Sequence, residues 1–557
     1  MKTGAKILIE SLQREGVETI FGYPGGQILP VYDELYDSPL RHILVRHEQA
    51  AAHAADGFAR ASGRVGVCLA TSGPGACNLV TGIASAYMDS VPVVAITGQV
   101  PTYMLGNDAF QESDITGITM PVTKHSYLVK KTEEISRVVQ EAFYIAGTGR
   151  PGPVLVDLPK DTQTGRAKDV TLFEKVVLRG YNPTYKGHSR QIDKVIALIL
   201  EAERPLIYAG GGIIASNASE ELMTFAVQMG IPVTTTLMGI GSLPCDHPLN
   251  LGMLGMHGTE YANFAVTESD LLIAIGARFD DRVTGKIDTF APHAKIVHID
   301  IDPAEIGKNK RVDVPIVGDV KAVLKDMLSS IKKRGVHDAW RKKIQHWREN
   351  YPLKYKDDGR LHPQFILHQM NALLKGDATI VSEVGQNQMW TAQHFCFRRP
   401  RSWITSGGLG TMGYGFPAAI GAHFARPDLP VFDVAGDGSI QMNIQELGTV
   451  AQYKIPVRVA ILNNQYLGMV RQWQELFFDR RYSYTELPSV DFVKIANAYG
   501  VEGVRVETPE EVMPALREAL ACDGAFVLDF RIEREDNVFP MVPAGAAINE
   551  MIGGHPR

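Results

Sequence analysis

Short apolar runs alternate with amphipathic stretches along most of the chain. Runs such as VGVCLA and PVVAIT in the first third, LLIAIG in the middle and PVFDVAG in the last third are separated by helical patterns. Strands that alternate with helices form parallel sheets covered on both faces. The pattern therefore predicts an α/β protein with three doubly wound parallel-sheet domains, a Rossmann-like one at the centre, over residues 1–165, 190–345 and 360–557.

The first and last of these domains share a longer pattern. Placing GACNLVTGIASAYMDSVPVVAI beneath IQMNIQELGTVAQYKIPVRVAI aligns Asn78 with Asn443 and, after one gap, two prolines that each open an apolar strand ending in VAI. We interpret the match as an ancient duplication, with convergence of two unrelated βαβ units as the alternative. Ser72 of the first copy falls opposite Asp437 of the second, so only the second copy has a carboxylate there.

The charge balance bears on possible partners. The chain has 557 residues, 45% of them hydrophobic, and its 56 Lys and Arg against 62 Asp and Glu give a net charge of −6. The basic residues form no long run that could follow a phosphate backbone, so we expect no nucleic-acid partner. No apolar stretch reaches the roughly 18 residues of a membrane-spanning helix, so we expect no membrane partner either.

The N-terminus and the cysteines bear on the compartment. The segment MKTGAKILIESLQREGVETIFGYPGG passes directly from a helical pattern into a strand, which leaves no room for a signal or transit peptide. The five cysteines are scattered without a CxxC motif, which argues against a disulfide framework, a zinc site or a dithiol redox centre. Both observations favour a reducing, cytoplasmic location, with the mature form of an organelle protein as the alternative.

Polar residues follow two apolar runs of the last domain. PVFDVAGDG brings Asp437 to the end of one strand, and VRVAILNN brings Asn464 to the end of the next, with residues 439–462, enough for one helix and a strand, between the motifs. A right-handed crossover places both strand ends at one edge of the sheet. The two side chains, with the Tyr466 carbonyl, would supply hard ligands for Mg²⁺, and the glycines and the following helix would admit a diphosphate. A lone Gly-Asp-Gly is also an ordinary turn.

This GDG and NN spacing resembles the signature of the thiamine diphosphate enzymes. In that family a glutamate in an apolar pocket bonds the N1′ atom of the aminopyrimidine ring, and Glu48, which follows an apolar strand and opens an Ala-rich helix, fits that role. A glutamate that complements the helix dipole is the alternative. Glu48 and Asp437 lie in different domains, and the family places its site between subunits, so the resemblance implies a homodimer or a larger homo-oligomer.

Motifs along the whole chain narrow the resemblance to the acetohydroxyacid (acetolactate) synthases, catalytic large subunit; they include RHEQAAAHAADGFARASG, GARFDDRVTG, SGGLGTMGYGFPAAIGA and LNNQYLGMVRQWQ. The resemblance implies condensation of two pyruvates to 2-acetolactate and CO₂, or of pyruvate with 2-ketobutyrate to 2-aceto-2-hydroxybutyrate, the first common step of branched-chain amino-acid biosynthesis. It also makes a small regulatory subunit an expected partner. The alternatives are an FAD-dependent pyruvate oxidase or decarboxylase on the same scaffold, a flavin-free catabolic acetolactate synthase, and a non-enzymatic binding platform.

The resemblance also assigns roles to further residues. The Gly410 carbonyl would accept a bond from the aminopyrimidine, and Met412 would support the bent cofactor. The other residues implied around the cofactor are Gln386, Asn387, Gly438, Ser439, Leu467, Gly468 and Met469. Those implied in the reaction pocket are Gly26, Phe110, Gln111, Lys160 and Trp473. Core packing is the alternative for Phe110, Met412 and Trp473, and a solvated surface position is the alternative for Lys160.

The middle domain carries the pattern of a second cofactor site. Three glycines after a strand, in YAGGG, would permit close approach of a phosphate, although three glycines also make an ordinary turn. An acidic residue at the end of a later strand could hold a ribose hydroxyl. The resemblance implies FAD, which does no net redox work in the reaction. The residues concerned are Gly210, Gly211, Gly212, Arg278, Arg282 and Asp300, to which the family adds Arg150, His257 and Asp319.

Overall fold

The computed structural model describes residues 1–168 and 176–553. Its first domain is built on a six-stranded parallel sheet. The sheet has the order β3-β2-β4-β5-β7-β6. Its strands are β2 (Thr19–Gly22), β3 (Arg41–Leu44), β4 (Gly66–Ala70), β5 (Val93–Gln99), β6 (His125–Leu128) and β7 (Val154–Pro159). The helices that cover it are α1 (Gly4–Arg14), α2 (Leu29–Tyr36), α3 (Glu48–Ser62), α4 (Pro74–Asn78), α5 (Val80–Met88), α6 (Ile115–Thr119) and α7 (Ile135–Gly147). The short strands β1 (Lys2–Thr3) and β8 (Arg166–Ala167) pair separately and antiparallel.

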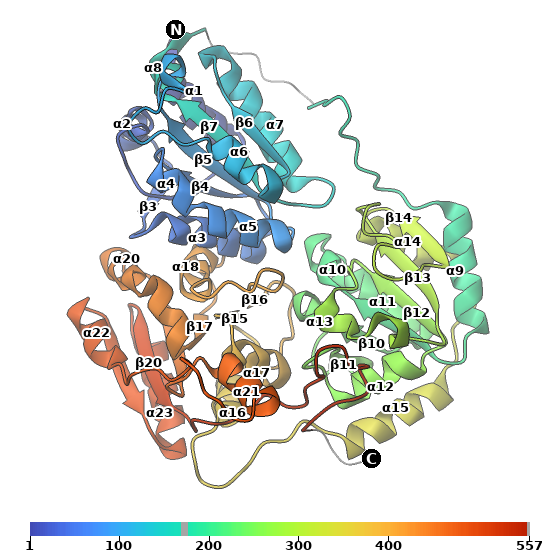
Figure 1. Cartoon of the computed structure of the whole chain (residues 1–557). Coiled ribbons are helices and arrows are strands. Elements are labelled where there is room, and N and C mark those ends of the chain that lie inside the picture. The colour runs from blue at the N-terminus through green and yellow to red at the C-terminus, as the bar shows by residue number, and fades with distance from the viewer. Residues whose placement is uncertain (169–175, 554–557) are drawn as a thin grey trace.

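The last domain repeats this arrangement (Figure 1). Its parallel sheet has the order β16-β15-β17-β18-β20-β19. The strands are β15 (Thr379–Ser382), β16 (Trp403–Ile404), β17 (Val431–Gly436), β18 (Val457–Asn463), β19 (Glu502–Val506) and β20 (Phe526–Arg531). Numbered along its own domain, each of the two sheets has the order 2-1-3-4-6-5. The shared order agrees with a duplication.

The middle domain has a different topology. Its parallel strands follow the order β11-β10-β9-β12-β13-β14, which is 3-2-1-4-5-6 along the domain and is the order typical of dinucleotide-binding sheets. The strands are β9 (Pro205–Ala209), β10 (Val233–Thr235), β11 (Asn250–Met253), β12 (Leu271–Ile275), β13 (Lys295–Asp300) and β14 (Val314–Val317). The predicted α/β fold with three parallel sheets is confirmed.

The first and last domains meet along two helices, α3 and α18 (Gly415–Ala425) (Figure 1). Their backbones touch: a Cβ atom added to Gly57 would lie 2.1 Å from the Ala418 carbonyl oxygen, and one added to Gly421 would lie 1.8 Å from that of Ala54. Only glycine allows this separation. The Ala-rich face of α3 therefore packs on the last domain of the same chain, while Glu48 opens the helix at one end.

The middle and last domains are joined covalently, contrary to the prediction from cysteine spacing. Cys245 and Cys396 form a disulfide, with their Cα atoms 5.4 Å apart and a sequence separation of 151. The Cys245 N–H also donates to the Phe397 carbonyl, 3.0 Å away. The prediction was wrong for this pair because tertiary packing of two domains brings the cysteines together, and no local motif indicates it.

Among the described residues, no helix has both the length and the apolar character that a membrane-spanning helix needs.

Candidate active site

The edge of the last sheet holds a buried carboxylate. β17 ends at Gly436, which pairs with Leu462 of the neighbouring parallel strand β18, so α19 (Asp437–Ile440) begins beside Asn464. Asp437 is 3% exposed, and burial raises its pKa to about 7, opposed by backbone N–H donors that include those of Asn464 and Gln465. Among the described residues, no cationic side chain is one of the main contributors to this balance. A divalent cation would supply the missing positive charge.

An anion cradle lies next to Asp437. The Asn464 amide donates to Gln386 Oε1 (3.1 Å), and Gln386 is the first residue of α17 (Gln386–His394). Gly468, which opens α21 (Gly468–Phe477), lies so close that an added Cβ would be 2.1 Å from the Gln386 Oε1 atom. Asn387 donates to the Val434 carbonyl at 2.8 Å and so faces β17. Two helix N-termini therefore meet beside the carboxylate, an arrangement that suits a diphosphate.

A glycine-rich loop, residues 407–413, closes one side of this edge. The Asn443 amide donates to the Gly413 carbonyl at 2.6 Å, and Gly410 and Gly413 adopt positive φ angles of 71° and 85°. Met412 approaches the edge, because its Cε atom would lie 3.8 Å from a Cβ added to Gly438. Leu467 also lies beside Gly438, with its Cδ2 atom 2.8 Å from the same position. The structure therefore gathers the residues predicted for the diphosphate and for the loop beneath the aminopyrimidine.

Glu48 lies elsewhere in the chain. It is half-buried, and its Oε2 atom accepts a hydrogen bond from the Asn78 amide at 2.9 Å. At the far end of the α4 and α5 segment, Asp89 accepts the N–H groups of Gly407 and Gly408, at 2.9 and 2.7 Å. The 11 residues from Asn78 to Asp89 amount to roughly 16 Å of helix at 1.5 Å per residue. A single chain thus holds Glu48 away from its own glycine-rich loop.

The other candidates of the first domain gather at the carboxyl edge of its sheet. The Lys160 ammonium donates to the Gly26 carbonyl at 3.0 Å. Gln111 has a φ of 59° and packs its backbone on Gly73, while Phe110 is 84% exposed. Large apolar side chains on the same loops are also exposed: Tyr103, Met104, Ile118 and Met120. In the described chain this edge is an open surface rather than a closed pocket.

A cavity of about 740 Å³ lies between the three domains. Eight of the nine residues predicted for FAD line it: Arg150, Gly211, Gly212, His257, Arg278, Arg282, Asp300 and Asp319. Gly210 lies behind the wall, since a Cβ there would be 2.0 Å from the Gly276 carbonyl oxygen. Gly410, Met469 and Trp473 line the end toward the last domain, so the cavity leads to the glycine-rich loop.

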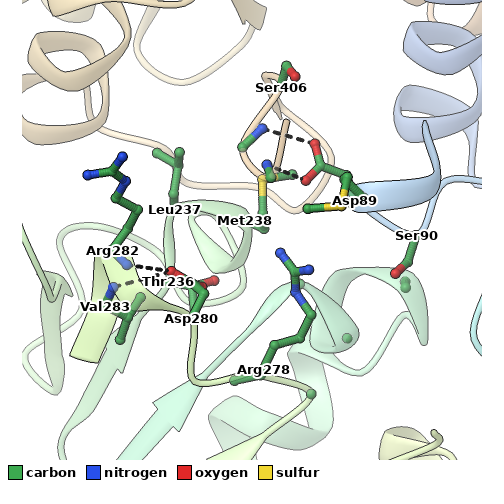
Figure 2. Close-up of a pocket in the computed structure, with 18 of the residues that line it drawn as sticks. Asp89, Ser90, Thr236, Leu237, Met238, Arg278, Asp280, Arg282, Val283 and Ser406 are labelled. Carbon is green, nitrogen blue, oxygen red and sulfur yellow. Dashed lines mark hydrogen bonds between the residues drawn. The ribbon is translucent and has the colours of Figure 1, made fainter. Parts of the chain in front are cut away.

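Charged groups face this cavity from several sides (Figure 2). Arg278 projects into it, and Asp280 caps α13 (Asp281–Thr284) by accepting the N–H groups of Arg282 and Val283. Burial raises the pKa of Asp300, at the end of β13, to about 6. The arginine and the glycines at this cavity would suit the phosphates of a dinucleotide, and Asp300 would suit a ribose hydroxyl.

Some cavity residues were not predicted from the sequence. Asp89, which fixes the loop amides, and Met238, which packs against Gly211 and Gly407, come from segments without a binding motif. Asp280 lies within GARFDDR, which follows an apolar run, so this position could have been used to predict Asp280 as a cavity residue.

Two sheets of one strand order, a third of the dinucleotide-binding order and an anion cradle beside a buried aspartate define a three-domain α/β cofactor enzyme. Family models of the thiamine pyrophosphate enzymes match the chain in three parts: the N-terminal TPP binding domain over residues 2–118, the central domain over 192–327 and the C-terminal TPP binding domain over 383–530. The chain belongs to this family, as a thiamine-diphosphate-dependent acetolactate synthase large subunit.

The similarity to individual acetolactate synthases extends over the full length. The chain is 54% identical to a probable acetolactate synthase large subunit of Methanocaldococcus jannaschii, over 99% of this chain and 95% of that protein. It is 52% identical to a large subunit of Mycobacterium tuberculosis, over 99% and 91%, and 48% identical to one of Haemophilus influenzae, over 100% and 99%.

Proposed function

We propose that this acetolactate synthase condenses two pyruvates to 2-acetolactate and CO₂, and pyruvate with 2-ketobutyrate to 2-aceto-2-hydroxybutyrate, using thiamine diphosphate, Mg²⁺ and FAD. The observation that carries the proposal is the buried Asp437 carboxylate, which lies among backbone N–H donors beside the cradle of Gln386, Asn464 and Gly468. Thiamine diphosphate, when bound, supplies a carbon nucleophile that adds to the keto group of pyruvate.

The last domain would hold the diphosphate end of the cofactor. The Asp437 carboxylate, the Asn464 amide oxygen and the Tyr466 carbonyl are hard oxygen ligands of the kind that Mg²⁺ takes. In the described chain the Asn464 oxygen accepts the Tyr466 N–H at 3.1 Å, so it already points along the turn that carries the third ligand. Ser439, Gln386, Asn387 and the backbone of 467–469 would contact the diphosphate. The Gly410 carbonyl would orient the aminopyrimidine, above Met412.

The first domain would act on the cofactor of a second copy of the chain. Glu48 would hold a proton at the N1′ atom of the aminopyrimidine, with the Asn78 amide fixing the carboxylate at 2.9 Å. Gly26, Phe110, Gln111 and Lys160 would then cover the reacting atoms and exclude water. Phe110 is 84% exposed in the single chain, which supports a homodimer whose partner covers this edge.

The cavity between the domains would hold FAD, with the dinucleotide phosphates near Gly211 and Gly212 and the ribose near Asp300. Trp473 lies at the end of the cavity nearest the loop, where it would limit the space for the second keto acid. Since relatives of this chain are named as large subunits, a small regulatory subunit is also part of the proposal.

The test is colorimetric detection of acetolactate formed from pyruvate alone, with thiamine diphosphate, Mg²⁺ and FAD each omitted in turn from the purified apoprotein. We expect acetolactate only in the complete mixture, and 2-aceto-2-hydroxybutyrate only when 2-ketobutyrate is added to it. Full activity without thiamine diphosphate or without Mg²⁺ would contradict the proposed site. Full activity without FAD would remove the flavin from the proposal and leave the rest.

A further inference from the structure

Two fully buried carboxyl groups lie beneath the edge that carries Asp437. Glu383 follows the last residue of β15, and Asp433 lies in the neighbouring strand β17, paired with Val381; both side chains are 0% exposed. Gly415, the first residue of α18, passes beside both. A Cβ there would lie 2.4 Å from Asp433 Oδ1 and 2.7 Å from the Glu383 nitrogen. The start of α18 is therefore built around this pair.

Glu383 connects two segments of the proposed cofactor site. Its Oε2 atom accepts the Ser439 hydroxyl at 2.6 Å and the Gly413 N–H at 2.8 Å, and its Oε1 atom accepts the Phe416 N–H at 3.1 Å. Ser439 belongs to the turn that carries Asp437. Gly413 ends the glycine-rich loop. One carboxylate thus joins the diphosphate edge to the loop that would orient the aminopyrimidine.

The two carboxyl groups differ in their hydrogen-bond partners. Neither oxygen of Asp433 has a hydrogen-bond partner within the described residues. Burial and the nearby Glu383 raise the pKa of Asp433 well above its usual value, which favours its neutral form. Burial also raises the pKa of Glu383, but the hydroxyl and N–H donors around it oppose the rise. Glu383 is consequently the member of the pair that acts as a hydrogen-bond acceptor.

We propose that Glu383 is a positioning residue, which holds residues 410–413 in register with Asp437 and Ser439 so that the two ends of one cofactor fit together. A loop with four glycines in seven positions, 407–413, has many accessible backbone conformations, and an internal acceptor for its last N–H reduces them. The inference rests on the proposed thiamine diphosphate site.

The test compares Glu383→Gln with Asp433→Asn in full-length protein. The Gln amide nitrogen cannot accept the hydrogen bonds that one Glu383 oxygen receives, although the side chain keeps its shape. We expect the Kd for thiamine diphosphate at saturating Mg²⁺, measured by tryptophan fluorescence or calorimetry, to rise about tenfold or more in Glu383→Gln, because a buried donor is left without its acceptor. In Asp433→Asn, a control of equal burial, and for FAD binding by either variant, we expect a change of less than about threefold.

Four outcomes would overturn the inference. They are wild-type thiamine diphosphate affinity in a folded Glu383→Gln protein, equal losses in both variants, equal losses of FAD and thiamine diphosphate affinity, or wild-type protein that binds no thiamine diphosphate. The last outcome alone would also refute the proposed function. If Glu383→Gln does not fold, as judged by circular dichroism, Glu383→Asp replaces it. The shorter side chain lengthens the contacts to Ser439 and Gly413, and we expect a Kd increase of about three- to tenfold, with wild-type affinity again overturning the inference.

Discussion

The first and last sheets have the same strand order, but the groups of residues at their carboxyl edges differ. In the last sheet, Asp437 is buried among N–H donors, and the neighbouring Glu383 accepts the Gly413 N–H of the glycine-rich loop. At the equivalent position of the first sheet, Ser72 is also buried, but its hydroxyl has no partner among the described residues and the surrounding loops expose Phe110. One scaffold thus carries two different edges: one with a buried carboxylate among N–H donors, and one that is exposed in the single chain and that we propose a second copy covers.

Removing the carboxylate from the edge of the last sheet should have the largest effect. Asp437→Ala leaves no anionic ligand for Mg²⁺ at this edge, so we expect thiamine diphosphate to be lost on gel filtration and acetolactate formation to fall by about 100-fold or more. The measurements are the thiamine content of the eluted protein and the rate of product formation. Ser72→Ala is the matched control in the first sheet, with activity expected within about threefold of wild type. Cofactor retention by Asp437→Ala would contradict the metal site.

Changing Glu48, at the carboxyl edge of the first sheet, should lower turnover and leave the binding of thiamine diphosphate largely unchanged. Glu48→Gln keeps the size of the side chain but cannot hold the proton at the aminopyrimidine nitrogen, so we expect kcat to fall about 100-fold or more. The Kd for thiamine diphosphate should change by less than about tenfold, because the diphosphate contacts lie in the other domain. Titration of the purified variant measures the second value. Wild-type kcat would refute the role proposed for Glu48.

Mixing these two variants tests whether the two edges meet across a dimer. A mixed dimer of Glu48→Gln and Asp437→Ala chains contains one site with both native residues and one with neither. After unfolding and refolding of an equal mixture, random pairing should restore about a quarter of the wild-type activity. Each variant refolded alone is the control. If both residues served one site within a single chain, the mixture would be as inactive as its components.

The sequence could predict features that follow from strand ends and glycine motifs. The spacing from Asp437 to Asn464 is enough to bring both to one edge, because a right-handed crossover has only one way to return. YAGGG likewise marks the cavity, since its glycines follow a strand in a dinucleotide-type sheet. These features depend on local order along the chain.

Features that arise between domains, or between segments far apart within one domain, could not be predicted in this way. The disulfide of Cys245 and Cys396 depends on how two domains pack, and so does the hydrogen bond that Asp89 accepts from the glycine-rich loop. The hydrogen bonds that Glu383 accepts depend on a loop 30 residues further along, which no periodic pattern specifies. Glu48 was predicted to act with Asp437, yet its position within one chain could only come from the structure.

The disulfide gives the last domain a covalent support that the first domain lacks in the described structure. It closes a loop of 151 residues, and such a link constrains the unfolded chain by up to about 4–5 kcal/mol in the chain-entropy model. We expect Cys245→Ser with Cys396→Ser to lower the thermal midpoint by several degrees under oxidising conditions, roughly 2–4 °C per kcal/mol for a domain of this size. Calorimetry with and without a thiol reductant measures the effect, and Cys522→Ser is the control. An unchanged midpoint would show that the pair does not stabilise the fold.

The smallest effect concerns Glu446, which joins the two edges. Its carboxylate accepts the Arg46 N–H at 2.9 Å and the Thr449 hydroxyl at 2.6 Å, and burial raises its pKa to about 7 despite these bonds. Because the folded protein then binds a proton that the unfolded chain releases near pH 4.5, this group favours folding less as pH rises from about 4.5 to 7. Glu446→Gln removes the titration, so the drop in thermal midpoint between pH 5 and pH 8 should shrink by about 1–3 °C relative to wild type. An equal drop in both proteins would mean that Glu446 does not titrate in this range, and that the contact between the edges is insensitive to pH.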